Sequence, residues 1–215
     1  MKYSLAIFDL DGTLLSTLED IADSCNEILL RNNFPTRTYE EIKSFVGNGI
    51  PKLIERAFPE NTDSTTHKKI TQEFIEYYRS HSAIKTAPYP GIKDFLTELK
   101  KAGIKIAVNS NKHEGASIDL CNKFFPDLID AVAGGKPDVP HKPDPSGVNK
   151  ILSTLAIPRD KAVYIGDSDV DVQTGANAGI AEIAVTWGFR SEEFLKEHGA
   201  KNLAHNTAEL NKFFK

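Results

Sequence analysis

The stretch Tyr3–Leu15, YSLAIFDLDGTLL, decides the fold of this protein. It opens with a short apolar run, Leu5–Phe8, which is typical of a strand buried on both faces of a parallel sheet. The run ends at two carboxylates, Asp9 and Asp11, beside Gly12. Two like charges at the end of a buried strand are costly unless they have a use, so we interpret the pair as functional.

The rest of the chain repeats the pattern of a short apolar run followed by a helical segment. Further strands are predicted at Ile104–Val108, Ile129–Val132, Ala162–Ile165 and Ile180–Val185, and helices at Gly91–Ala102, Ser146–Ala156 and Val170–Ala178. Alternation of strand and helix predicts an α/β fold with a doubly wound parallel sheet, which is a Rossmann-like core.

Residues 17–83 break this alternation, because they show helical periodicity and no convincing strand. We therefore expect an inserted all-helical cap domain at 17–83 and a core domain made of residues 1–16 and 84–215. The prolines and glycine of Pro88–Gly91 suit a stiff junction between the two. An insert that directly follows the first strand is expected over the carboxyl end of that strand.

Composition narrows the possible partners. Thirty acidic residues against 26 basic ones give a net charge of -4 in 215 residues, with no basic patch, so we expect no nucleic acid as a partner. No apolar run reaches membrane-spanning length and no signal peptide is evident, so no membrane partner and a cytoplasmic location are expected.

Cys25 and Cys121 lie in apolar helical patterns and are predicted to be buried, reduced thiols. The sequence leaves the oligomeric state undetermined, as a monomer or a homodimer.

Polar clusters follow three predicted strands and precede one predicted helix. They are Asp9–Thr13, Asn109–Lys112 and Gly166–Asp171 after strands, and His141–Pro145 before a helix. Ligands of doubly wound sheets bind beyond the carboxyl ends of the strands, so the clusters are expected to meet in one crevice.

Gathering several carboxylates in such a crevice requires a cation. The candidate metal ligands are Asp9, Asp11, Asp167 and Asp171. Oxygen ligands without histidine or cysteine favour a hard ion, and Mg²⁺ suits a site that also binds phosphate. Lys142 and the Ser110 hydroxyl would add the positive charge and the donor that an anionic substrate needs. A carboxylate such as Asp9 can attack phosphorus, while a second carboxyl in reach can move the proton.

At this point the sequence resembles the haloacid dehalogenase superfamily. The resemblance is carried by four ordered motifs, DLDGTL at 9–14, Asn109-Ser110-Asn111, Lys142-Pro143-Asp144-Pro145 and Gly166-Asp167-Ser168-Asp169-Val170-Asp171, with Gly47-Asn48-Gly49 and Trp187-Gly188. Together with the helical insert, they make the chain similar to the phosphoglycolate phosphatase-like members from end to end.

The resemblance implies a role for each matching residue. Asp9 would be the nucleophile, Asp11 the general acid and base whose backbone carbonyl also touches the metal, Ser110 the phosphate-binding hydroxyl, Lys142 the lysine that stabilises the intermediate, Asp167 a metal ligand and Asp171 its support. Asn111 is a further candidate for substrate binding, and Gly47, Asn48 and Gly49 would form a cap loop that reaches the substrate.

Other cations compete for these roles. Lys136 also precedes a proline, but the spacing of the motif favours Lys142, and Lys136 is expected to be an exposed loop charge. Lys112, His113 and Arg56 are candidates for the non-phosphoryl end of the substrate, although we expect each of them to be a surface residue.

These observations predict a Mg²⁺-dependent phosphatase that hydrolyses a small-molecule phosphate ester through an aspartyl-phosphate on Asp9. The resemblance makes phosphoglycolate the expected substrate. Two alternatives stay open: a phosphotransferase or mutase acting on sugar phosphates on the same scaffold, and a non-enzymatic phospho-accepting signalling module.

Overall fold

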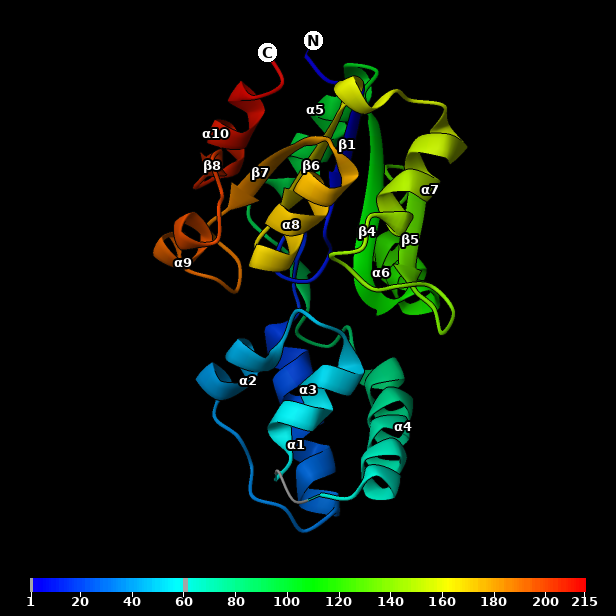
Figure 1. Cartoon of the computed structure of the whole chain (residues 1–215), viewed down its shortest axis with the longest axis vertical. Coiled ribbons are helices and arrows are strands. Elements are labelled where there is room, and N and C mark those ends of the chain that lie inside the picture. Colours follow the sequence, from blue (N-terminus) through cyan, green and yellow to red (C-terminus); the bar gives the residue numbers. More distant parts are fainter. Residues whose placement is uncertain (1, 60–61) are drawn as a thin grey trace. The chain divides into compact units, whose positions relative to one another are not determined.

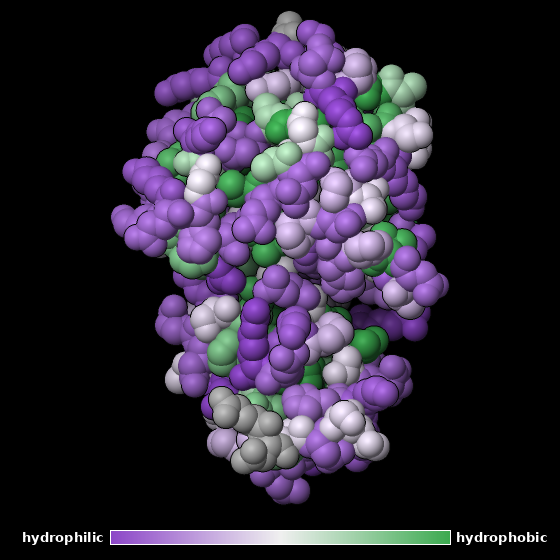
Figure 2. Space-filling model, viewed as in Figure 1, coloured by the Kyte–Doolittle hydropathy of each residue, from purple (hydrophilic) through white to green (hydrophobic). Residues whose placement is uncertain are grey.

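The computed structural model describes residues 2–59 and 62–215, which fall into two compact units (Figure 1). The α/β unit contains the chain up to Leu15 and the segment Pro88–Lys215. The helical unit contains Ser16–Ala87. Hydrophilic side chains cover most of the face shown in Figure 2, as expected for the polar outer surface of folded units.

The α/β unit is built on a six-stranded sheet with the order β5-β4-β1-β6-β7-β8. Its strands are β1 (Leu5–Phe8), β4 (Lys105–His113), β5 (Ala131–Gly135), β6 (Ala162–Gly166), β7 (Ala181–Val185) and β8 (Leu203–Ala204). Every pairing is parallel, and β1 lies between β4 and β6. The predicted doubly wound parallel sheet is thereby confirmed.

Side chains of β1 alternate between the two faces of the sheet, as the pleat requires. Leu5 and Ile7 belong to a core cluster with residues of α7 and α8. Phe8 points the other way, where its ring meets Phe95 of α5, and Phe95 meets Phe214 after α10. Helices therefore cover both faces, and burial on both sides explains why β1 reads as an unbroken apolar run.

The helices of this unit connect the strands. They are α5 (Ile92–Lys101), α6 (Glu114–Phe124), α7 (Ser146–Leu155), α8 (Asp169–Ala178), α9 (Glu192–Glu197) and α10 (Thr207–Lys212), with one 3-10 turn at Arg159–Lys161. The three helices expected from periodicity are present. Gly179 ends α8 in the left-handed conformation (φ 64°), as glycine readily does.

Three features of the sheet differ from expectation. The strand β5 spans Ala131–Gly135 instead of the predicted Ile129–Val132. The strand β4 runs on through Asn109–His113, beyond its predicted end at Val108, and its register against β5 shifts between Asn109 and His113. The edge strand β8 was missed because two residues carry no periodic signal. The bulge in β4 matters for the site, since bulges redirect side chains.

The helical unit consists of α1 (Leu18–Arg31), α2 (Tyr39–Phe45), α3 (Ile50–Ala57) and α4 (Ser64–His81). Its core is apolar and aromatic, with Ile28 and Phe74 fully buried and the Phe74 ring stacked on Tyr78. None of the helices within 2–59 and 62–215 is long and apolar enough to cross a membrane.

The chain enters and leaves the helical unit through two short strands that pair, β2 (Leu15–Ser16) and β3 (Ala87–Pro88). The expected boundary at 83/84 lies four residues before the one at Ala87. Residues 84–86 stay with the helical unit because their three backbone amides donate to the carboxylate of Asp20 in α1, at 2.9–3.1 Å. A sequence pattern cannot reveal a contact made across 64 to 66 residues.

Candidate active site

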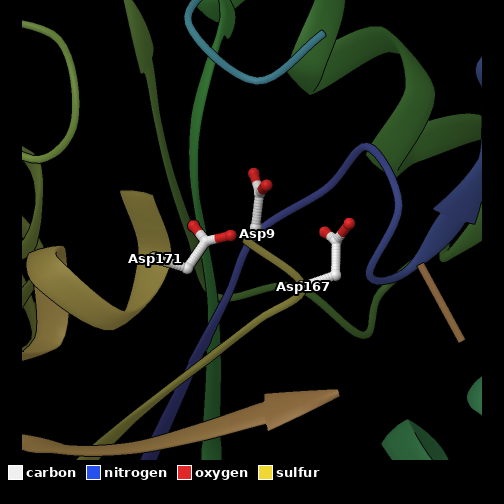
Figure 3. Close-up of side chains that lie close together, drawn as sticks. All are labelled: Asp9, Asp167 and Asp171. Atoms are coloured by element: carbon white, nitrogen blue, oxygen red, sulfur yellow. The ribbon is translucent and has the colours of Figure 1, made fainter. Parts of the chain in front are cut away.

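Three aspartates meet at the carboxyl edge of the sheet, where the strand order reverses around β1. Asp9 follows β1, Asp167 follows β6, and Asp171 lies in the first turn of α8. One oxygen from each lies within 4.8 Å of the others. Figure 3 shows Asp9 between the other two, with the three carboxyl groups side by side. A reversal of strand order is where doubly wound folds bind ligands.

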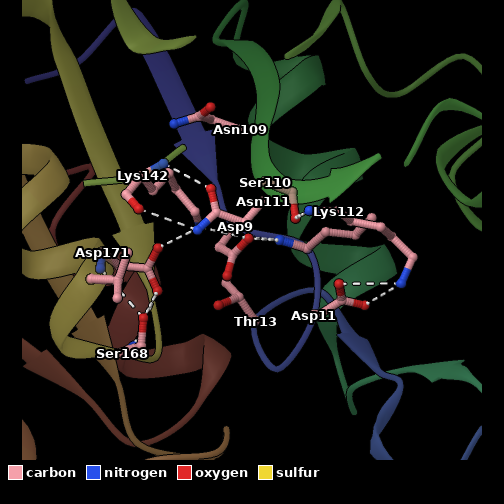
Figure 4. A network of polar contacts seen from close by, with 12 residues as sticks. Asp9, Asp11, Thr13, Asn109, Ser110, Asn111, Lys112, Lys142, Ser168 and Asp171 are labelled. Atoms are coloured by element: carbon pink, nitrogen blue, oxygen red, sulfur yellow. Dashed lines mark hydrogen bonds and ion pairs between the residues drawn. The ribbon is translucent and has the colours of Figure 1, made fainter. Parts of the chain in front are cut away.

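Lys142 supplies a positive charge within this cluster. Its ammonium lies 2.9 Å from Oδ1 of Asp9 and 2.7 Å from Oδ1 of Asp171. The Lys142 side chain is 4% exposed and that of Asp171 is 2% exposed, so little water screens these contacts (Figure 4). With all three carboxyl groups ionised, one ammonium would leave the cluster with a net negative charge, which a bound cation would offset.

Two members of the cluster, Asp9 and Asp167, have raised pKa values and so hold their protons more tightly than an ordinary aspartate. Burial raises the pKa of Asp9 to about 8; Lys142 opposes the rise, while Asp171 and Asp167 add to it. Burial also raises the pKa of Asp167 to about 7, and Asp171 contributes to that rise. For Lys142 burial favours the neutral form, but Asp171 and Asp9 outweigh it and raise the pKa well above its usual value.

Both oxygens of Asp167 accept hydrogen bonds from neighbouring segments. The Thr13 hydroxyl donates to Oδ1 at 2.8 Å, and the backbone amide of Phe189 donates to Oδ2 at 2.7 Å. Gly12 and Gly188 pack so closely that a side chain at either position would collide with Asp167. The site thus requires two glycines because backbone approaches the carboxylate from both sides.

Asp171 is oriented by the start of α8. The backbone amide and the hydroxyl of Ser168 donate to Oδ2 of Asp171 at 3.1 and 2.6 Å, and the backbone amide of Asp171 donates back to Ser168 Oγ at 3.3 Å, which completes a capping box. This leaves Oδ1 for Lys142. The hydroxyl of Tyr164, in β6, lies 3.4 Å from the same Oδ1 and donates to the Asn109 carbonyl at 3.1 Å.

The bulged part of β4 lies against the cluster. Ser110, Asn111 and Lys112 are all buried. The amide side chain of Asn111 accepts from the backbone N–H of Lys142 at 2.7 Å and donates to its carbonyl at 3.3 Å. Asn111 therefore holds the Lys142 backbone in place, a contact that the expectation of substrate binding did not include. Ser110 Oγ accepts the backbone N–H of Lys112 at 3.2 Å.

The carboxylate of Asp11 lies outside the group of three. Its two oxygens lie 3.1 and 3.3 Å from the ammonium of Lys112 (Figure 4). The expectation that Lys112 is a surface residue is therefore wrong: the β4 bulge and this ion pair bury it. His113, in contrast, is exposed and accepts the Gly115 amide at the start of α6.

Lys136 and Arg56 each contact a residue of their own unit. Lys136 is exposed, as expected, and pairs with Glu114 at 2.6 Å. Arg56 is exposed and donates to the Phe45 carbonyl at 2.8 Å. The loop Gly47–Gly49 belongs to the helical unit and precedes α3, with a positive φ of 84° at Gly49.

The cluster fits a hard divalent cation by the chemistry of its donors. Its three members offer carboxylate oxygens, without histidine or cysteine. Mg²⁺ prefers such ligands and combines one or two carboxylates with phosphate oxygens. The raised pKa values of Asp9 and Asp167 agree with a cation site, because both groups resist ionisation by themselves and a bound cation would favour their ionised forms.

Comparisons with known proteins agree with this geometry. A family model for haloacid dehalogenase-like hydrolases matches residues 6–185. The chain belongs to the haloacid dehalogenase-like hydrolase family. A phosphoglycolate phosphatase from Cereibacter sphaeroides is 34% identical over 199 residues, which cover 90% of each chain. One from Caulobacter vibrioides is 32% identical over 209 residues, covering 95% of this chain and 88% of that protein.

Solved structures of this family share the fold of the whole chain. A crystal structure from Lactobacillus delbrueckii subsp. bulgaricus, provisionally named a phosphoglycolate phosphatase, has a TM-score of 0.94 and 36% identity over 99% of this chain and 98% of that one. CbbY from Rhodobacter sphaeroides, in complex with xylulose-(1,5)-bisphosphate, has a TM-score of 0.76 and 27% identity over 97% and 96%. The family expected from the motifs is confirmed, and with it an enzyme of the phosphoric monoester hydrolase class.

Sequence reasoning missed several residues that shape this family site. Thr13 and Ser168 lie inside the quoted motifs, and the Ser168–Asp171 spacing of a capping box was readable. Tyr164 had no signal, because an aromatic residue in an apolar strand reads as core. Trp187 was noted as part of a motif; it is half-buried, and its indole N–H donates to the Thr13 carbonyl at 3.1 Å, which ties two loops of the site together.

Proposed function

We propose that the protein is a Mg²⁺-dependent phosphatase that hydrolyses a small phosphate ester through an aspartyl-phosphate on Asp9. The observation that carries the proposal is the buried contact of Asp9 with Lys142 inside the group of three aspartates. A nucleophilic carboxylate beside a buried ammonium suits attack on a phosphate, because the ammonium offsets the substrate's charge.

In the first step an oxygen of Asp9 attacks phosphorus, and the bond between phosphorus and the ester oxygen breaks. Asp11 donates a proton to the departing oxygen, so the leaving group departs as a neutral alcohol. Lys142 faces Asp9 and stabilises charge on the phosphoryl oxygens, and the buried Ser110 hydroxyl offers them a hydrogen bond.

In the second step Asp11 takes a proton from water as the water oxygen attacks phosphorus. The bond between phosphorus and the Asp9 oxygen breaks, which releases inorganic phosphate and restores the Asp9 carboxylate. Asp11 ends the cycle protonated, as it began. The same side chain thus acts as the acid in the first step and, once it has lost its proton, as the base in the second.

A bound Mg²⁺ would supply charge neutralisation of the phosphate and a fixed orientation for it. Asp9 and Asp167 would hold the ion directly, together with the backbone carbonyl of Asp11. Asp171 would support it indirectly, as the resemblance implies, while its carboxylate accepts hydrogen bonds from Lys142 and Ser168. The donors Thr13 and Phe189 keep Asp167 oriented for this role.

For the substrate we propose phosphoglycolate, on the strength of relatives that carry this name along nine-tenths of the chain. A pentulose bisphosphate is the second candidate, because CbbY was crystallised with xylulose-(1,5)-bisphosphate. We further propose that the helical unit, Ser16–Ala87, acts as a cap that excludes water and selects the leaving group, with Gly47–Gly49 among its substrate contacts.

The test is release of inorganic phosphate from a panel of esters, with Mg²⁺ and with a chelator. The panel contains phosphoglycolate, xylulose 1,5-bisphosphate, pyrophosphate and nucleoside and sugar monophosphates. Trapping the enzyme during turnover and mapping the phosphopeptide should place the phosphoryl group on Asp9. The Asp9→Asn variant should neither turn over nor form the phosphopeptide. Undiminished turnover by that variant would disprove the nucleophile assignment.

A further inference from the structure

Lys112 and Asp11 form an ion pair at the edge of the site. The proposed mechanism uses Asp11 but gives Lys112 no role. The Lys112 ammonium contacts both oxygens of Asp11, at 3.1 and 3.3 Å. The Lys112 side chain is 5% exposed and that of Asp11 is 15% exposed. Contact with both oxygens restrains the rotation of the carboxyl group, which a contact with one oxygen would not.

A demand for stability does not account for this pair. Removing two charges from water costs about as much as their attraction returns, so buried pairs of this kind contribute little net stability compared with apolar side chains. The neighbourhood could have been apolar, since the preceding part of β4, Ile106–Val108, is fully buried hydrophobic sequence. A buried charge pair kept at the edge of a catalytic cluster indicates a use in the chemistry.

The strand β4 is shaped to deliver Lys112 to this place. Its pairing with β5 is regular up to Asn109 and resumes only at His113, so residues 110–112 form the irregular part. Within it, Asn111 holds the Lys142 backbone while Lys112 contacts Asp11. One bulge therefore serves two charged groups of the site, as bulges beside active sites commonly do.

We propose that Lys112 is a positioning residue that sets the orientation of Asp11 for proton transfer to the leaving group, an inference that rests on the proposed phosphatase mechanism. Lys112 holds the Asp11 carboxyl group in one fixed orientation relative to Asp9. When Asp11 gives its proton to the ester oxygen, the carboxylate that forms lies beside an ammonium that is already in place. No reorganisation is then needed during the step.

The dependence on the leaving group separates this role from a structural one. An alkyl ester such as phosphoglycolate needs a proton on its departing oxygen, whereas p-nitrophenyl phosphate departs as a stable phenolate and needs little help. The ratio kcat/KM reports the steps up to the departure of the first product. A misplaced Asp11 should therefore impair the alkyl ester much more than the aryl ester.

The experiment compares kcat/KM for phosphoglycolate and p-nitrophenyl phosphate in wild type, Lys112→Met, Lys112→Arg and Lys105→Met, all with Mg²⁺. Lys105 is the matched control, because it lies at the other end of β4 and pairs with Asp130 at 3.0 Å. Lys112→Met removes the charge and keeps the length of the side chain. Lys112→Arg keeps a cation that can contact both oxygens of Asp11.

For Lys112→Met we expect kcat/KM for phosphoglycolate to fall on the order of 10²-fold, which is the effect of misplacing a reacting group by about 1 Å. The value for p-nitrophenyl phosphate should change little, Lys112→Arg should recover most of the loss, and Lys105→Met should match wild type with both esters. Equal losses with both esters in Lys112→Met, or no loss, would overturn the assignment while leaving the phosphatase proposal intact. A folded wild type that hydrolyses neither ester would overturn both.

Discussion

Replacing Asp9 by asparagine should stabilise the metal-free protein at high pH while it abolishes turnover. Burial raises the pKa of Asp9 to about 8, so the folded chain holds this proton far more tightly than the unfolded chain does. A group of this kind stabilises the fold while it is protonated. Its contribution is complete below about pH 4 and is lost as the pH rises through about 8. Asparagine resembles the protonated form at every pH.

The size of the effect follows from the distance between the two pKa values. An aspartate in an unfolded chain titrates near 3.9, which is about four pH units below the value in the folded protein, and each unit corresponds to about 1.4 kcal/mol. The full difference approaches ~6 kcal/mol. Relaxation around the charged group reduces it, so we expect Asp9→Asn to be more stable than wild type by about 2–6 kcal/mol at pH 9. At pH 5, about one unit above the pKa in the unfolded chain, the difference should shrink to about 1.5 kcal/mol or less.

Urea unfolding with a chelator present, followed by tryptophan fluorescence at pH 5 and pH 9, measures this difference. The single tryptophan, Trp187, donates to the Thr13 carbonyl in the α/β unit and reports on the unfolding of that unit. Asp130→Asn is the matched control, because the pKa of Asp130 is lowered in the folded protein whereas that of Asp9 is raised. Although burial raises its pKa, the Ile106 amide and Lys100 outweigh this and lower it, so that variant should lose stability at pH 9.

Added Mg²⁺ should raise the free energy of unfolding of wild type more than that of the variant, because the ion stabilises ionised Asp9 and the variant lacks that ligand. A variant that is less stable than wild type at pH 9 without metal would refute the reasoning. Such a result would mean that the contact of Asp9 with Lys142 outweighs burial and repulsion from the neighbouring aspartates.

Two further predictions concern the metal and the helical unit. Mg²⁺ affinity should weaken as the pH falls from 8 to 6, since protons on Asp9 and Asp167 compete with the ion. Calorimetry in two buffers of different ionisation enthalpy should show that binding releases protons. An affinity that does not change with pH would contradict this prediction. Asp20→Asn should lower the free energy of unfolding by about 2–3 kcal/mol, because charge-assisted hydrogen bonds to the amides of residues 84–86 are lost. Circular dichroism during urea unfolding measures this, and an unchanged midpoint would count against it.

The sequence by itself determined the α/β core and the identity of the charged groups. Strand β1 matched its expected bounds, Leu5–Phe8, because burial on both faces demands an unbroken apolar run. Asp9 and Asp167 stood out because carboxylates directly after buried strands have few structural uses. Lys142 was preferred over Lys136 from the motif spacing and the helix that follows it, and the structure places the Lys142 ammonium 2.9 Å from Asp9.

Only the tertiary structure decided which partner each charge takes. Nothing local shows that Lys112 is buried against Asp11, 101 residues away, or that Asn111 holds the backbone of Lys142. The end of the helical unit was likewise set by Asp20, through amides 64 to 66 residues further along the chain. Apolar periodicity is a property of a short segment, so it can be read directly. Pairing of polar groups depends on which segments folding brings together, so it cannot.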